Sequence, residues 1–188
     1  MNKVMRSVMS ALRRGLVSGV VVGVMAVAGG SGLAACGPSG AQLRTAKAAE
    51  YKLSGKQMLD VAVQVAQGKY KLGALDIDSL AFATAQQFYT PEGMRISPNN
   101  SGQGDFVNAG GGDLALQLIV QVIETGPDRV AVTVTPKTLQ FIAGSPKPRE
   151  LTPDDPNLPG WVLGRANALA VEIYDAGKQY VAPPAPGS

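Results

Sequence analysis

The chain has 188 residues, of which 17 are basic and 14 acidic, and it contains one cysteine and no histidine. The lack of histidine excludes Ser-His-Asp and Cys-His catalysis, and a single cysteine excludes a redox dithiol or an internal disulfide. Four basic residues and no acidic residue precede Cys36, so the rest of the chain has 13 basic and 14 acidic residues and lacks the positive charge of a nucleic-acid binder.

The first 35 residues have the pattern of an export signal. Lys3, Arg6, Arg13 and Arg14 precede an uncharged run rich in Val, Ala and Gly. A positive region, an apolar region and small residues before a cleavage site are typical of a secretory signal peptide. We therefore expect a signal peptide over residues 1–35. The alternative is a permanent transmembrane anchor, because a run of about 18 residues is close to the length that spans a bilayer.

The export segment ends in Leu33, Ala34, Ala35 and Cys36, which resembles the lipobox of bacterial lipoproteins. The resemblance implies cleavage before Cys36, a diacylglycerol thioether on its sulfur and an acyl chain on its new amine. Two or more acyl chains hold a protein firmly on a membrane, so the membrane would be a partner of the chain. Gly37 replaces the Asp that retains many Gram-negative lipoproteins at the inner membrane, which favours the periplasmic face of the outer membrane in such a cell. The alternative is an ordinary buried cysteine.

The remaining chain divides into three parts. Residues 36–49 are small and polar without periodicity, which predicts an acylated cysteine followed by a flexible tether. Residues 50–181 have the length and patterning of a single α+β domain, which begins with a short strand at 50–53. Residues 182–188 are Pro-rich, which predicts a disordered tail.

A helix is predicted over residues 54–68. Ser54 is a favourable N-cap residue, and Gly68 stands where a helix commonly ends. Val61 and Val63 are β-branched, which leaves a strand as the alternative. The predicted buried face repeats at helical spacing and consists of Met58, Leu59, Ala62, Val65 and Ala66.

Two strands are predicted next, over residues 70–77 and 80–89. Asp76 and Asp78 lie between them in a stretch that can turn through side-chain hydrogen bonds. In the second strand the larger side chains alternate with alanines. The predicted core face of this strand is Leu80, Phe82, Thr84, Gln86 and Phe88.

A β-hairpin is predicted from residue 113 to residue 142, with its turn at 125–128. The turn contains Gly126 and Pro127. The first strand alternates between apolar residues on one face and Ala115, Gln117, Ile119 and Gln121 on the other. The predicted core residues of this strand are Leu114, Leu116, Leu118, Val120 and Val122.

A last helix is predicted over residues 159–180, with an apolar stripe made by Val162, Ala166, Leu169, Ile173 and Ala176. The fold class is therefore α+β: a two-layer sandwich in which an antiparallel sheet of three to five strands carries two helices on one face. This order of elements behind a lipobox is similar in plan to the helix-grip domains of BamC-like lipoproteins. That resemblance implies attachment to outer-membrane assembly machinery.

Three features of the sequence are candidate interaction sites. The irregular segment 90–113 contains the apolar pair Phe106 and Val107, which either fold back onto the domain or contact a partner. Its glycines do not follow a phosphate-binding motif. Gln117 and Gln121 on the polar sheet face either solvate it or form a hydrogen-bonding surface for a protein or glycan. Trp161 is expected to anchor the start of the last helix, with a binding hot spot as the alternative.

The acidic pairs Asp76 with Asp78 and Asp154 with Asp155 could hold Ca²⁺ or catalyse glycoside hydrolysis, but turn and capping roles explain both pairs. We therefore expect no catalytic residues, no metal and no cofactor. The function expected is a non-catalytic adaptor or structural subunit, lipid-anchored in the cell envelope, with a protein partner there. The alternative is a periplasmic carrier of a small apolar or lipid-like ligand between the sheet and the helices.

Overall fold

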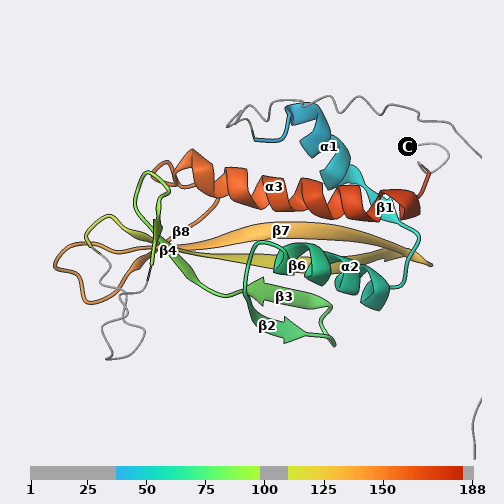
Figure 1. Ribbon diagram of the computed structural model, residues 1–188, viewed down its shortest axis with the longest axis horizontal. Helices are drawn as coiled ribbons and strands as arrows, with labels where there is room; N and C mark the ends of the chain where they lie inside the picture. The colour runs from blue at the N-terminus through green and yellow to red at the C-terminus, as the bar shows by residue number, and fades with distance from the viewer. Residues whose placement is uncertain (1–36, 98–109, 184–188) are drawn as a thin grey trace, which may run out of the picture. The chain divides into compact units, whose positions relative to one another are not determined.

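A computed structural model describes residues 37–97 and 110–183. The helices are α1 (Gly40–Ala48), α2 (Gly55–Gln67), α3 (Gly160–Gly177) and the short 3₁₀ helix η1 (Lys178–Tyr180). The strands are β1 (Glu50–Tyr51), β2 (Leu72–Asp76), β3 (Ala81–Thr84), β4 (Gln87–Tyr89), β5 (Arg95–Ile96), β6 (Leu114–Gly126), β7 (Arg129–Gln140) and β8 (Arg149–Leu151). Figure 1 shows their arrangement.

The strands form one antiparallel sheet whose main order is β1-β7-β6-β3-β2. Three short strands extend it: β4 pairs with β6 and β5, and β8 pairs with β7. The predicted α+β class with an antiparallel sheet is confirmed, and the five strands of the main order fall within the predicted range. Among the described residues, the eight strands and the third α-helix exceed the prediction, because strands of two or three residues carry too little periodic pattern to be recognised.

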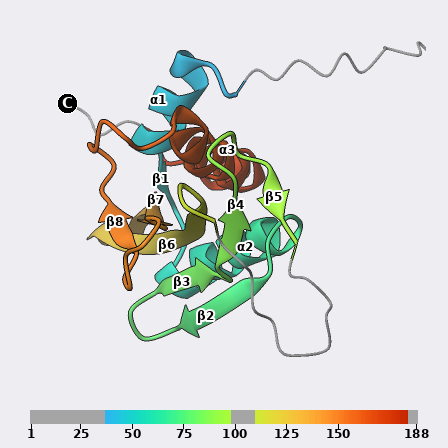
Figure 2. The ribbon, with the colours of Figure 1, turned by 90° about the vertical axis from the view of Figure 1, so that its left-hand side faces the viewer.

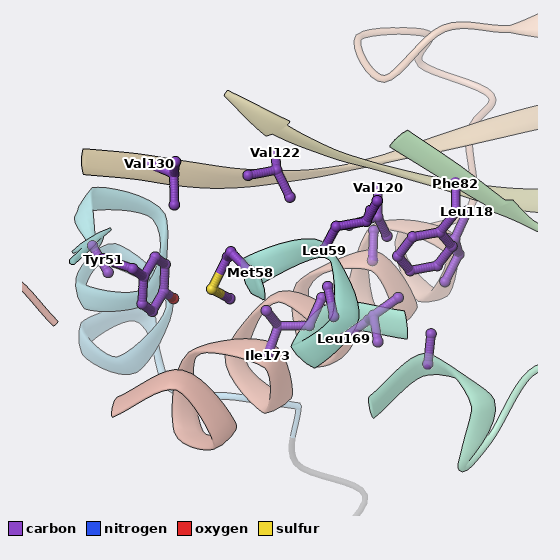
Figure 3. Close-up of a cluster of buried hydrophobic side chains, with 14 of the residues drawn as sticks. Tyr51, Met58, Leu59, Phe82, Leu118, Val120, Val122, Val130, Leu169 and Ile173 are labelled. Carbon is purple, nitrogen blue, oxygen red and sulfur yellow. The ribbon is translucent and has the colours of Figure 1, made fainter. Parts of the chain in front are cut away.

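The core lies between one face of the sheet and the helices α2 and α3. Alternate residues of β6 point into it, and Met58 and Leu59 from α2 meet Leu169 and Ile173 from α3 (Figure 3). The predicted core face of β6 is confirmed, because Leu114, Leu116, Leu118, Val120 and Val122 are all buried. We call this side of the sheet the inner face and the opposite side the outer face.

The predicted helix at 54–68 is confirmed as α2. The Ser54 hydroxyl accepts the backbone N–H of Gln57, whose side chain accepts the backbone N–H of Ser54, so two N-terminal donors are satisfied. The last helix is confirmed as α3 followed by η1. Its stripe is buried at Val162, Ala166, Leu169 and Ile173 and continues at Gly177, whereas Ala176 is exposed.

The prediction of a flexible tether is wrong for residues 40–48, which form α1. Ser39 and Gln42 make a capping box, and Ala46 is buried where α1 packs against α3. The backbone N–H of Ala182 donates to the Glu50 carbonyl at 2.7 Å, so the ordered domain also extends past residue 181. A run of small residues gives little amphipathic signal, and its docking depends on α3, which lies more than 100 residues later.

The prediction of one continuous strand over 80–89 is wrong, because the chain divides into β3 and β4. Ala83 pairs with Ile119 of β6, whereas Gln87 pairs with Leu116, so three residues of this strand lie opposite two of β6. One extra residue reverses which side chains face the core. Tyr89 is therefore buried in place of the predicted Phe88.

The predicted hairpin is confirmed as β6 and β7. Its register runs continuously from Leu114 opposite Gln140 to Glu124 opposite Val130, and Gly126 then pairs with Arg129. Seen end-on, the sheet curves around α2 while α3 lies beside it (Figure 2). The outer face of the long hairpin is thus turned away from both helices, and this position makes it the candidate site.

Candidate functional site

The candidate site is the outer face of β6 and β7, because α2 and α3 both pack on the other side of the sheet. Residues opposite each other in an antiparallel pair point to the same face. Across the hairpin Ile119 lies opposite Thr135, Gln121 opposite Thr133 and Ile123 opposite Ala131. Polar and branched apolar side chains therefore alternate along this surface.

Gln121 and Ile123 are exposed on the β6 side of this surface. Ile123 is 41% exposed. Thr133 and Thr135 on β7 are exposed beside them. A branched aliphatic group beside an amide, with hydroxyl groups on the neighbouring strand, can contact another protein through apolar burial and hydrogen bonds together. The placement of Gln121 agrees with the surface predicted from the sequence.

Gln117 lies on the same face, opposite Lys137, but it is less accessible than Gln121 because its side chain bonds to the neighbouring strand. Its amide nitrogen donates to the Thr84 carbonyl at 2.9 Å, and Gln117 is partly buried. This contact lies where β3 ends and the backbone ladder with β6 is interrupted. Gln117 therefore satisfies a backbone acceptor of β3 with one of its amide N–H groups.

The far end of the outer face carries a small apolar cluster. The rings of Phe88 and Phe141 lie 6.0 Å apart between centroids, and Ala115 is only 1% exposed. A shallow cavity of about 90 Å³ beside them is lined by Gln86, Ala115, Gln117, Lys137 and Leu139. This volume holds a few water molecules and is far below that of a ligand pocket.

Trp161 anchors the segment before β5 to the start of α3, which supports the structural role expected for it. Its indole N–H donates to the Pro91 carbonyl at 2.9 Å. The Arg165 guanidinium lies 4.6 Å from the centre of the Tyr89 ring and donates to the Gly93 carbonyl at 3.2 Å. These contacts give the indole N–H a hydrogen-bond partner and hold the guanidinium over the Tyr89 ring.

The acidic pairs act in turns. The Asp76 carboxylate accepts the backbone N–H groups of Asp78 and Ser79. The pKa of Asp76 is lowered, chiefly by the Ser79 side chain and then by these backbone N–H groups. The backbone N–H of Asn157 likewise lowers the pKa of Asp155, which also pairs with Arg149. Within residues 37–97 and 110–183, no three acidic or metal-binding side chains come together.

The space between the sheet and the helices is filled by side chains. Met58, Ala62, Val120 and Val162 have no solvent exposure. A larger hollow of about 380 Å³ lies at the surface, where Ser54, Gly55 and Lys56 face Leu80 and Glu124. It is open to solvent, and both signs of charge border it.

The other predicted site residues lie outside the described residues: Leu33, Ala34, Ala35, Cys36, Phe106 and Val107. In the part of the chain that the structure covers, no helix is both long enough and apolar enough to cross a bilayer.

Three comparisons with known proteins found no matching family model, no matching curated protein and no matching solved structure.

Proposed function

We propose that this chain is a lipid-anchored protein of the bacterial cell envelope whose α+β domain acts as a non-catalytic adaptor or structural subunit. The observation that carries the adaptor role is the outer sheet face, where Gln121 and Ile123 are exposed on the side away from both helices. A regular sheet is a rigid support. Binding to a rigid surface loses little conformational entropy, because few groups have to be ordered when the partner binds.

The proposed lipid anchor rests on the sequence from Leu33 to Cys36. The position of α1 determines how far the domain would lie from the membrane. Only residues 37–39 separate Cys36 from the first residue of α1. An extended chain spans about 3.3–3.6 Å per residue, so acyl chains on Cys36 would hold the domain within roughly 15 Å of the membrane surface. Such a domain would bind partners near the bilayer.

The alternative role as a carrier of an apolar ligand gains no support from the interior. The side chains between the sheet and the helices are packed to zero exposure at Met58, Ala62, Val120 and Val162. A carrier of a drug-sized ligand needs a cavity of about 300–1,000 Å³ lined mostly by apolar groups. The surface hollow beside Ser54 has sufficient volume but is bordered by Lys56 and Glu124.

The lipid anchor is tested with Cys36→Ala. We expect the wild-type chain to fractionate with membranes and to carry acyl groups on Cys36 by mass spectrometry. The variant should lose the acyl mass and leave the membrane fraction. Wild-type protein with an uncut, unmodified N-terminal segment would contradict the anchor.

The adaptor role is tested by placing a photo-crosslinking residue at Gln121 in the full, membrane-attached chain. We expect a defined protein adduct from Gln121 and none from Asp60, an exposed position on α2 that serves as the control. An assembly component of the outer membrane in the adduct would support the partner class implied by the BamC-like plan. Equal labelling from both positions, or lipid adducts alone, would contradict the adaptor role.

A further inference from the structure

The structure points to self-association through strand β2. In the described sheet β2 is the last strand of the main order, and its only described neighbour is β3. The other edge of β2 therefore presents backbone donors and acceptors that a further strand can pair with. Every residue of β2 except Leu72 is exposed, including Leu75 at 48%. We propose that a second copy of this chain pairs with this edge, antiparallel to the first.

When two copies are related by a twofold axis, opposite charges next to this edge come to lie opposite each other. The stretch from Lys71 to Asp76 has its cation at one end, its anion at the other and Leu72 and Leu75 just inside them. In a twofold pair, residue i lies opposite residue j and residue j opposite residue i. Antiparallel pairing centred between Gly73 and Ala74 therefore places Lys71 opposite Asp76 of the second copy, twice.

The same register places leucines opposite each other. Leu72 would lie opposite Leu75 of the second copy, and opposite residues interact only when they point to the same face. Residues three apart in a regular strand point to opposite faces. In β2, however, Leu72 pairs with Thr84 and Leu75 pairs with Phe82, both of which are buried on the inner face. Both leucines are therefore directed to the inner face, as the proposed register requires.

An irregularity at Gly73 makes this arrangement possible. The register of β2 against β3 shifts between Leu72 and Ala74. A Cβ atom on Gly73 would lie 2.8 Å from the Thr84 carbonyl oxygen, so a side chain at this position would clash with the backbone of β3. Because the strand contains this extra residue, Asp76 falls on the outer face opposite Ala81, and Lys71 alternates with Leu72 onto that same face.

The second copy is favoured over an unrelated peptide by this self-complementarity. A strand with like charges at both ends would repel its own copy, because like charges directly opposite each other are destabilising. Here the cation and the anion stand at equal distances from the centre of the proposed register, with the two leucines between them. The paired strands would form one continuous sheet with α2 and α3 of both copies on the same side.

The test uses two full-length copies with different affinity tags, expressed together, and measures the fraction that co-purifies. We expect wild-type copies to associate. Lys71→Asp in both copies, or Asp76→Lys in both copies, places like charges opposite each other and should reduce co-purification about tenfold. One copy with Lys71→Asp and one with Asp76→Lys restores both opposite-charge pairs and should restore association.

A folding control is needed because Asp76→Lys removes a hydrogen-bond acceptor in the turn after β2. Restored association of the mixed pair would show that both variants fold. Lys137→Asp makes the same charge change on an exposed position of β7 and should associate as the wild type does. The proposal does not depend on the lipid anchor, so the same result is expected in the Cys36→Ala background. Wild-type copies that do not associate, or single reversals without effect, would overturn it and leave Lys71 and Asp76 as charges that protect the edge.

Discussion

The Thr84 hydroxyl accepts a hydrogen bond from the backbone N–H of Leu118 at 3.0 Å, in the buried part of the sheet. The bond lies where the strand opposite β6 contains one extra residue. An interrupted ladder leaves backbone groups unpaired, and buried unpaired groups are strongly destabilising. Thr84 supplies the acceptor, and Gln117 donates to the Thr84 carbonyl. Two side chains thus replace the missing backbone partners.

Replacement of Thr84 by valine should therefore destabilise the protein. Valine keeps the shape but leaves the Leu118 N–H without its acceptor, so we expect the free energy of unfolding to fall by about 1–3 kcal/mol. Thr84→Ser keeps the hydroxyl and should lose less. Urea denaturation measured by circular dichroism checks both. An unchanged midpoint for Thr84→Val would show that the backbone N–H finds another acceptor.

The same substitution at Thr138 should have the opposite effect. Thr138 is also fully buried, but its hydroxyl has no hydrogen-bond partner among the described residues. An unpaired buried hydroxyl costs free energy that valine does not incur. We expect Thr138→Val to raise the free energy of unfolding by about 1 kcal/mol, measured in the same denaturation experiment. A loss of stability would contradict the absence of a partner for this hydroxyl.

Gly93→Ala should weaken the anchor made by Trp161. Gly93 has a φ of +89°, and a Cβ atom there would lie 3.0 Å from the indole ring. Backbone strain alone is expected to lower the free energy of unfolding by about 1–2 kcal/mol. Gly164→Ala is the control, because nothing lies within 4 Å of its added Cβ and alanine favours a helix by about 1 kcal/mol. Thermal unfolding should therefore shift in opposite directions for the two variants.

Alkaline pH should destabilise the fold through Tyr51. Its side chain is 1% exposed, and burial raises the pKa of Tyr51 to about 12. In the unfolded chain a tyrosine titrates near pH 10. The stabilisation is therefore complete below about pH 10 and is lost as the pH rises towards 12, with a full change of about 3 kcal/mol, of which about 2 kcal/mol is lost by about pH 11.5.

Urea denaturation at pH 9 and pH 11.5 measures this loss. Tyr51→Phe cannot ionise and should remove that part of the pH dependence. Tyr180→Phe removes a hydroxyl from a more exposed position and serves as the control. Equal pH dependence in wild type and Tyr51→Phe would contradict the assignment to Tyr51.

Limited trypsin digestion distinguishes the docked helix α1 from a flexible tether. Arg44 and Lys47 lie within α1, so cleavage after them requires the helix to open. We expect slow cleavage in the wild type and an increase of about tenfold or more in Ala46→Asp, which buries a carboxylate against α3. Ala41→Asp, on the exposed side of the first turn, should cleave as slowly as the wild type. Rapid cleavage of the wild type would instead indicate that residues 40–48 form a flexible tether.

Some elements could be predicted because the chemistry that forms them is local. The Ser54 cap, the helical spacing that leads to Ala66 and the turn at Gly126 and Pro127 each lie within a few residues. The alternation along β6 predicted its buried face for the same reason, since successive side chains of a strand point to opposite faces of the sheet. Gln121 was placed correctly by that alternation.

The tertiary structure alone decided the features that depend on a distant segment. The extra residue after Thr84 is recognisable only by comparison with β6. Because of it, Tyr89 is buried in the core where Phe88 was predicted to be. The small residues before Glu50 become a helix in contact with α3, although their own pattern is weak. Periodicity fixes the direction of a side chain relative to its own strand or helix, whereas register and docking are set by the partner element, whose position no local pattern contains.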